Sequence, residues 1–372
     1  MKKIKLSLSM FLCVLLLIGC ADPKILERVS LAVLIGYDVK DGKITTNVAL
    51  RTVNQELQSV VSIASETEET SKGTRIKASL DSSKKIVAGQ LRVVLLGDKL
   101  AENGVNQALH TLMMNSEISS SVYVAITEGS TKGIVDADYE QITDIGQHIY
   151  YLLDHNVQEQ YTISSTLHET IRDNYSSFSD MSLPMLVKDE DDVHISGVAL
   201  FNDDKMVGKI ADKDVFYVVL IRDKYKAGAT QITLSSEPFK TSKTKLPDEP
   251  PMAIDSIRSL SKIRLVDEKT PEFDLNIKFE ARLLEIHSDI DTEDDSVMTK
   301  LEQEMTKVFK KDIERIIKQT QEVNSDIFGF GETYRATLGT TKVNEKVWKE
   351  LYPKMKVNIN IEFELLRNGV FE

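Results

Sequence analysis

A change of hydrophobic period near residue 290 constrains the fold of this 372-residue chain more than any other feature. Residues 273–287 alternate apolar and polar side chains, which is typical of a strand that buries one face. From about residue 293 to residue 322, apolar side chains recur instead along one face of a helix. A helix of this length is stabilised mainly by packing of that face. We therefore expect the helix to lie across a sheet that includes the flanking strands, at about 254–266, 273–287 and 356–366.

Strand and helix patterns follow one another through the first half of the chain. A hairpin is predicted at about 29–50, with Asp41-Gly42 at its turn. Residues 91–96 and 120–127 have the apolar composition of buried strands. The predicted helices lie at about 74–88, 99–114, 143–155 and 165–175. This succession predicts mixed sheets packed with helices, so the expected fold class is α+β.

Two polar segments indicate domain boundaries. One is the charge run over 188–192, and the other is the proline-rich stretch over 237–251. A chain of this length has room for two or three domains. The expected parts are a signal peptide (1–19), an N-terminal α+β domain (20–190), a middle domain (191–250) and a C-terminal α+β domain with the long helix (251–372).

The first twenty residues have the pattern of a lipoprotein signal peptide. Lysines at positions 2, 3 and 5 precede an apolar run over 6–18, which is short for a membrane span. Leu17-Ile18-Gly19-Cys20 then places a small residue directly before a cysteine, as signal peptidase cleavage and lipidation require. We predict that Cys20 becomes the mature N-terminus and carries diacylglycerol and N-acyl lipid. The alternative is a plain N-terminal anchor helix, which leaves the Gly19-Cys20 pair unexplained.

Charge and cysteine content exclude several classes of function. Loss of the three leader lysines changes the formal net charge from −12 to about −15, so nucleic acid is not an expected partner. The sequence has no polybasic run, so we expect the acyl chains to provide membrane attachment. Cys13 leaves with the leader and lipid occupies Cys20. The mature chain is therefore expected to have no disulfide, no thiol nucleophile and no cysteine metal site.

The histidines do not form a recognisable metal motif. His148 and His155 lie seven residues apart, so they share one helix face. His168-Glu169 begins the pattern of a zinc protease, but the second histidine, four residues after the first, is missing. We interpret all three histidines as surface or half-buried side chains.

An acidic run over 289–295 superficially resembles a calcium loop. An EF-hand loop that began at Asp289 would need glycine at the position of Asp294 and glutamate at the position of Lys300. We interpret the run instead as a solvated turn whose carboxylates favour the N-terminus of the long helix.

The glycine-rich stretch Phe328-Gly329-Phe330-Gly331 lacks the Lys-Ser/Thr that a phosphate-binding loop requires. We predict a packed turn, with both aromatic rings in the core and the glycines at unusual dihedral angles. The chain also lacks a Gly-x-Ser-x-Gly elbow. We therefore expect no catalytic, cofactor-binding or metal-binding residues and no enzyme activity.

Several stretches, taken in order, resemble the Ger(x)C spore germination lipoproteins, the C subunits of nutrient germinant receptors in endospore-forming bacteria. The lipobox ending at Cys20 is the first. The others are Ile35-Gly36-Tyr37-Asp38, the segment 91–105, the hairpin over 196–208, and the segment 324–332 with the single Trp348. The chain departs from the family in having Ala21-Asp22 where many members have Trp-Asp.

The resemblance implies a non-enzymatic α+β protein of three packed domains, anchored by lipid on the outer face of the inner spore membrane. It also implies docking on integral-membrane A and B subunits and a role in the response to germinants such as amino acids. Two other hypotheses remain at this stage. One is a solute-binding lipoprotein of a transporter, although the strand-rich second half does not fit its repeated βα units. The other is a lipid-anchored hydrolase, which needs a nucleophile and a base that the sequence does not display.

Overall fold

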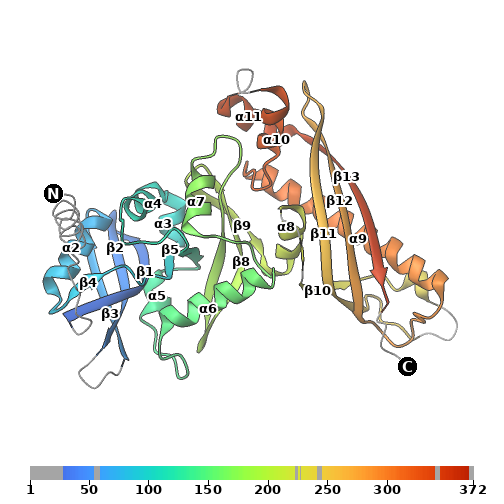
Figure 1. Cartoon of the computed structure of the whole chain (residues 1–372). Coiled ribbons are helices and arrows are strands. Elements are labelled where there is room, and N and C mark those ends of the chain that lie inside the picture. The colour runs from blue at the N-terminus through green and yellow to red at the C-terminus, as the bar shows by residue number, and fades with distance from the viewer. Residues whose placement is uncertain are drawn as a thin grey trace, which may run out of the picture.

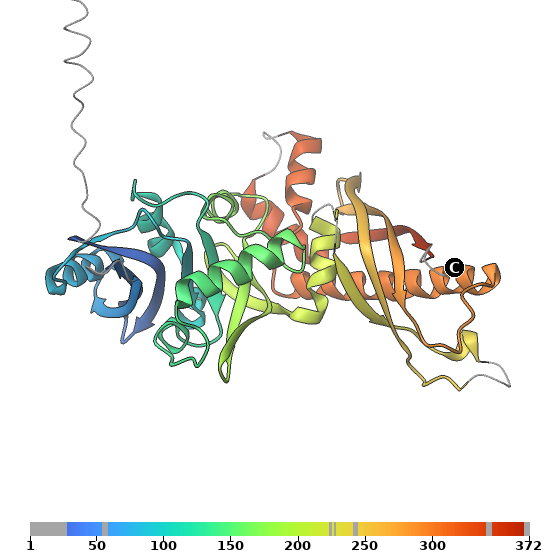
Figure 2. The same cartoon turned by 60° about the horizontal axis from the view of Figure 1, so that its bottom comes forward.

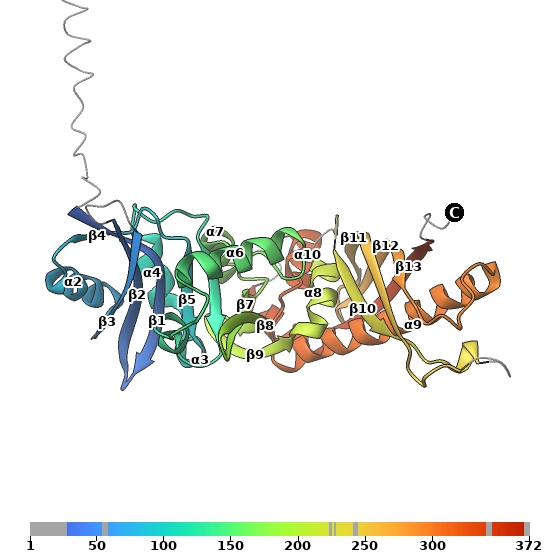
Figure 3. The ribbon, with the colours of Figure 1, turned by 90° about the horizontal axis from the view of Figure 1, so that it is seen from below.

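Two β-sheets follow one another along the computed structural model of the chain (Figure 1). The structure describes residues 28–53, 59–222, 225–226, 228–240, 245–339 and 344–367. Strand β1 (Val29–Lys40) lies toward one end of an elongated molecule, and helix α9 (Asp295–Glu322) extends toward the other (Figures 2 and 3). The fold is α+β with mixed sheets, as the sequence predicts.

The first sheet has strand order β3-β2-β1-β5-β6-β7-β8-β9, and β4 pairs with the start of β1. Its outer strands pair antiparallel, whereas β1, β5, β6 and β7 run parallel. Parallel strands are covered on both faces, which explains why all five residues of β5 are apolar or glycine and buried. The other strands are β2 (Lys43–Val53), β3 (Ser59–Glu68), β4 (Lys85–Val87), β5 (Val93–Gly97), β6 (Tyr123–Thr127), β7 (Ser182–Asp189), β8 (Asp192–Asn202) and β9 (Lys205–Ala211).

Helices cover both faces of this sheet, and alternate strand residues enter two cores. Val94 and Leu96 pack on the side of α3, α4 and α7, whereas Val93 and Leu95 pack on the side of α5 and α6. Helix α2 lies on the first of these sides, over β2 and β3. The helices are α2 (Ser71–Asp81), α3 (Asp98–Asn103), α4 (Asn106–Met113), α5 (Thr131–Val135), α6 (Ile145–Gln158) and α7 (Leu167–Asn174).

The second sheet has the order β10-β11-β12-β13, and α9 lies across it. Phe309 of α9 is fully buried, with ring centroids 4.9 Å from Phe279 and 5.3 Å from Phe363. The predicted packing of a long helix on a C-terminal sheet is therefore confirmed. The elements of this part are β10 (Ala229–Thr233), β11 (Pro251–Asp267), β12 (Glu272–Glu285), α10 (Phe330–Leu338), α11 (Glu345–Leu351) and β13 (Lys356–Leu366).

Helix α8 (Val215–Arg222) joins the two sheets, and all of its residues except the last are buried. Tyr217 donates a hydrogen bond to Asp312 of α9 (2.8 Å), and Arg315 makes two hydrogen bonds to Asp214 (2.9 and 2.7 Å). Strand β8 contributes Val198 to the core that it shares with the second sheet. The two sheets are therefore held together by a continuous apolar core.

Three predictions from the first half need correction or qualification. The helix expected over 74–88 ends at Asp81, because Ile86 and Val87 pair with β1 as strand β4. The single helix expected over 99–114 is broken into α3 and α4 at Gly104, whose φ of 123° is not helical. The charge run over 188–192 forms the turn of the β7–β8 hairpin, so the expected boundary at 190 falls within one continuous sheet.

Candidate functional site

Asp326 is a buried carboxylate at the start of α10, inside the 324–332 segment. Its Oδ1 accepts hydrogen bonds from the backbone N–H groups of Gly329 (2.9 Å) and Phe330 (3.1 Å). Its Oδ2 accepts from the N–H of Gly331 (2.7 Å) and from Nε1 of Trp348 (3.2 Å). The first turn of a helix leaves such N–H groups without intrahelical partners. The carboxylate therefore caps α10 and also positions the indole ring.

Asp180, just before β7, connects the first sheet to this cap. Its N–H donates to the carbonyl of Asp326 (2.9 Å), and its Oδ2 accepts from the N–H of Asp326 (2.8 Å). The Asp180 side chain is only 10% exposed. These reciprocal bonds join segments 146 residues apart in sequence, at the junction of the two sheets.

The turn between β8 and β9 lies at the same junction. Lys349 of α11 donates to Asn202 (2.6 Å), forms an ion pair with Asp203, and lies 3.6 Å from Asp180. The N–H of Asp203 donates to Asp180 Oδ1 (3.2 Å). The turn is thus connected to Asp180 both directly and through Lys349, and Asp180 in turn contacts Asp326.

The other side of this turn contacts the break between α3 and α4. The N–H of Val105 donates to the carbonyl of Asp204 (2.9 Å). Gly104 has a φ of 123°, which other residues rarely adopt, and a Cβ there would lie 2.6 Å from Asp204 Oδ2. The segments 91–105 and 196–208, which the family resemblance selects separately, therefore meet in space.

Aromatic packing surrounds the cap. Trp348 is 2% exposed, and its ring centroid lies 5.4 Å from Tyr334, 5.8 Å from Tyr352 and 6.2 Å from Phe273. A Cβ at Gly331 would collide with the indole and with the carbonyl of Phe178. The glycine therefore allows α10, α11 and the segment between α7 and β7 to approach closely.

A further buried carboxylate, Asp38, joins separate elements inside the first sheet by hydrogen bonds. It accepts hydrogen bonds from the N–H of Thr131 (2.8 Å), the hydroxyl of Thr131 (2.9 Å) and the amide of Asn47 (2.9 Å). Gly36 lets Thr131 approach β1 directly, because any Cβ there would overlap the threonine side chain. The Gly36-Tyr37-Asp38 stretch is thus explained by the docking of α5.

Burial perturbs both junction carboxylates. It raises the pKa of Asp326 to about 7, with a further contribution from the negative charge of Asp180, while the backbone donors oppose the rise. Burial also raises the pKa of Asp180, and Lys349 opposes that rise. Protonation at the junction is therefore coupled to the contact between the two sheets.

A cleft of about 310 Å³ lies beside this junction. Its charges are paired internally, since Asp173 contacts Arg222 (3.2 Å) and Arg172 (2.8 Å). Ser176 donates its hydroxyl hydrogen to Glu332 (2.9 Å), and no histidine lines the cleft among the described residues. The hydroxyl of Ser176 is thus bonded to a carboxylate and not to a histidine, the base that usually activates a serine nucleophile.

The residues weighed from the sequence lie apart from the junction. Cys20 falls outside the described residues, so its lipidation stays a prediction. His148 is half-buried on α6, 3.3 Å from Asp192, and His155 is exposed on the same helix. His168 is exposed on α7. Within the described ranges, no three His, Cys, Asp or Glu side chains are grouped so as to hold a metal ion.

The acidic run and the glycine-rich stretch behave largely as predicted. Asp294 is the N-cap of α9, and its side chain accepts from the N–H of Ser296 (2.8 Å). Phe328 and Phe330 are buried, and Gly329 has a φ of 75°. The prediction missed α10, which begins at Phe330 and contains the second glycine.

Nothing in the residue pattern indicates that Asp180 and Lys349 belong to the junction. Asp180 stands in a polar segment before β7, where an acidic side chain is ordinary. Asp326 carried a weak signal, because it precedes a helix by four residues among glycines and aromatics. No helix in the described ranges is both long enough and apolar enough to cross a membrane.

Two family models match almost the entire chain. The model described as "Spore germination protein N-terminal domain" matches residues 22–188, and the model described as "Spore germination B3/GerAC like, C-terminal" matches residues 196–369. The segment between them contains the β7–β8 turn.

Three individual proteins are similar to the chain. The spore germination protein GerQC of Bacillus cereus is 26% identical over 367 residues, which is 96% of each chain. The putative spore germination protein YfkR of Bacillus subtilis strain 168 is 22% identical over 284 residues, 74% of this chain and 71% of that one. The crystal structure of the GerBC protein has a TM-score of 0.52 at 16% identity, covers 89% of this chain and 96% of its own, and supports the fold alone.

Proposed function

Because the chain belongs to the GerAC family of spore germination proteins, we propose that it is the lipid-anchored, non-enzymatic C subunit of a nutrient germinant receptor. The observation that carries the proposal is the match of both family models, which together extend from residue 22 to residue 369. The subunit would take part in the response to germinants such as amino acids.

Cys20 supplies the membrane attachment in this proposal. Seven residues lie between Cys20 and Arg28, the first residue that the structure describes. A tether of this length spans at most about 28 Å when extended, so the first sheet would stay close to the bilayer surface. Two acyl chains on one cysteine anchor a protein stably where one chain would not. The location would be the outer face of the inner spore membrane.

A non-enzymatic role agrees with how the buried carboxylates are used. Asp326 and Asp38 accept hydrogen bonds from the segments that they hold together, and both are buried. Asp180 lines the junction cleft, but its oxygens accept from two backbone N–H groups. These groups are occupied in joining elements, which suits a protein that transmits or supports a conformational change.

Docking on polytopic A and B subunits is the expected mode of action. The alternative of a solute-binding lipoprotein needs two lobes of repeated βα units. Here β10, β11 and β12 pair antiparallel, and the second sheet contains one parallel crossover, from β12 to β13 through α9, α10 and α11, so the described part of the chain lacks that repeat there.

The experiment that tests the proposal is a Cys20→Ala substitution in spores. We expect intact-mass measurement to show loss of the lipid, fractionation to show release of the protein from the membrane, and germination with nutrients to weaken. Cys13→Ala is the matched control, because that cysteine lies in the part of the leader that is removed. Normal nutrient germination by spores whose Cys20→Ala protein has left the membrane would refute the mechanism.

A further inference from the structure

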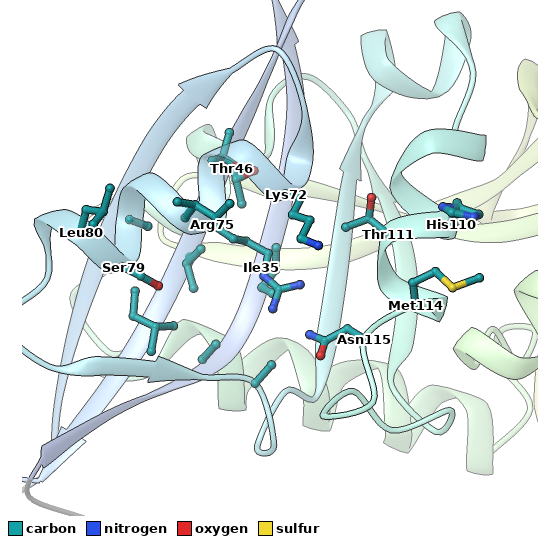
Figure 4. A pocket seen from close by; sticks show the side chains of 17 residues that line it. Ile35, Thr46, Lys72, Arg75, Ser79, Leu80, His110, Thr111, Met114 and Asn115 are labelled. Carbon is teal, nitrogen blue, oxygen red and sulfur yellow. Dashed lines mark hydrogen bonds between the residues drawn. The ribbon is translucent and has the colours of Figure 1, made fainter.

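A cleft of about 660 Å³ opens between α2 and α4, over one face of the first sheet (Figure 4). Ile35 of β1 and Val48 of β2 form part of its floor, and Ile86 of β4 closes one side. The residues that line the cleft belong to the first sheet and its helices, whereas Asp326 lies at the junction of the two sheets. The receptor role proposed above does not use this cleft.

The charged side chains of the described lining residues are basic. Lys72 and Arg75 come from α2, His110 comes from α4, and none of the described residues that line the cleft is Asp or Glu. This is unusual in a chain whose formal net charge is −12. No described carboxylate forms an ion pair with Lys72 or Arg75. Helix α2 thus places two positive charges in the cleft, and α4 adds an imidazole, although the sequence shows no basic run there.

The remaining polar groups in the cleft also favour an acceptor as ligand. Nδ2 of Asn115 is buried and donates to no described partner. The hydroxyls of Thr46 and Thr74 bond to one another (2.6 Å), and the hydroxyl of Thr111 is bonded to Ser71 (2.7 Å). The Asn115 amide, the Lys72 ammonium and the Arg75 guanidinium are therefore donors without a described acceptor. Figure 4 shows Lys72 and Arg75 reaching from α2 toward the wall that carries Thr111 and Asn115.

Apolar side chains stand exposed at the rim of the cleft. Ile76 is 55% exposed, Leu80 is 79% exposed, and Met114 is 65% exposed. All three line the same opening as the basic residues. The cleft thus has an apolar floor, an apolar rim and cationic side chains on one wall. These features match a ligand that has an apolar body and one negative group.

We propose that the α2–α4 cleft binds an amphipathic anion, whose carboxylate or phosphate is held by Lys72 and Arg75 and whose apolar part lies over Ile35 and Val48. The source is either a free amphiphile or a phospholipid of the membrane. A membrane source is compatible with the position of the cleft, because β4 on its wall pairs with Val29–Leu31, where the described chain begins. The proposal does not depend on the receptor role.

The test uses the full-length, lipid-modified protein in nanodiscs of zwitterionic phosphatidylcholine, with ¹³C-methyl methionine labelling. The Met114 signal is assigned with a Met114→Leu variant. Octanoate and octyl phosphate are the soluble probes, octanol is the uncharged control, and a second set of nanodiscs contains phosphatidylglycerol without any soluble probe. We expect a saturable shift of the Met114 signal with the anionic probes or with the anionic lipid, but not with octanol.

The variant Lys72→Gln/Arg75→Gln should weaken this binding at least about tenfold, because it removes two charged hydrogen-bond donors. Lys77→Gln is the matched control on the same helix, since Lys77 lies outside the cleft and pairs with Glu66 (3.1 Å), and it should bind normally. Thermal melting must show that each variant is folded. A shift only with phosphatidylglycerol identifies the bilayer as the source. No shift with any anion, an equal shift with octanol, or unchanged affinity in the folded double variant would overturn the proposal.

Discussion

Asp326 shows how one residue can be both well bonded and costly to bury. Four N–H donors surround its carboxylate, yet the loss of water raises its pKa to about 7 from an ordinary value of 3.8. In the unfolded chain the same group releases its proton near its ordinary pKa. Between these two values the folded protein therefore binds more protons than the unfolded protein does.

This difference gives a definite sign to the pH dependence of stability. From about pH 4 to about pH 7, the contribution of Asp326 to the free energy of unfolding should fall as pH rises, and it should level off above pH 7. We expect the wild type to lose a few kcal/mol relative to Asp326→Asn across this range, because asparagine does not ionise. Urea unfolding, followed by the fluorescence of the single Trp348 beside the carboxylate, measures the difference.

The opposite pH dependence would show that the pKa of Asp326 is lowered in the folded protein. If the four donors outweigh burial, the carboxylate stays ionised in the fold, and the wild type instead gains stability relative to Asp326→Asn as pH rises. A gap between the two proteins that is constant with pH would contradict any perturbation of this group.

Sequence reasoning recognised some of these residues by type but not their roles. Phe328 and Phe330 were correctly predicted to be buried, because aromatic residues among glycines in a chain of this size belong to a core. The link from Asp180 to Asp326 could not be predicted, since 146 residues separate them and a single acidic residue before a strand is unremarkable. Long-range polar pairs leave no periodic trace in the sequence.

At the scale of elements, α9 depends on its buried stripe. Phe309 lies at the centre of that stripe, with its ring 4.9 Å from Phe279 and 6.1 Å from Phe216 of α8. We expect Phe309→Ala to lower the free energy of unfolding by about 3–5 kcal/mol, because the large cavity would lie between α9, the second sheet and α8. Lys310→Ala, at the exposed next position, should change it by no more than about 0.5 kcal/mol.

Denaturant unfolding followed by circular dichroism compares the two variants. A loss of under about 1 kcal/mol in Phe309→Ala would mean that the helix is not held by this stripe.

Elements with strong periodicity were predicted well, and elements set by tertiary contacts were not. The strand at 356–366 and the long helix follow their apolar patterns almost to the residue. The residue pattern predicts a helix where strand β4 lies, because the pairing of Lys85–Val87 with β1 is a tertiary contact. Periodicity likewise does not show the break at Gly104, beside which the N–H of Val105 donates to Asp204 of a distant hairpin.

At the scale of the whole molecule, strand β8 has a double role. Val198 and Leu200 face the core shared with α8 and the second sheet, whereas Ala199 and Phe201 face the core of the first sheet. One strand therefore forms the wall between two cores. Division of the chain into domains ending at residues 190 and 250 stays a prediction, and the shared core means that such parts would not be independent.

The junction should nevertheless open locally when its polar link is removed. Asp180→Ala deletes the acceptor for the N–H groups of Asp326 and Asp203 and leaves Lys349 without one of its partners. We expect amide hydrogen exchange to rise in 324–332, α10 and α11, with a loss of local protection of about 1–3 kcal/mol. Strands β5 and β6 should keep their protection, because their residues are buried in the two other cores, which lie on either face of the first sheet.

Asp191→Ala, at the exposed β7–β8 turn, is the control and should leave the exchange pattern unchanged. An equal loss of protection in β5, β6 and α10 would mean that the two sheets open only as one unit, and that the Asp180–Asp326 link is not a separate contact through which movement could pass.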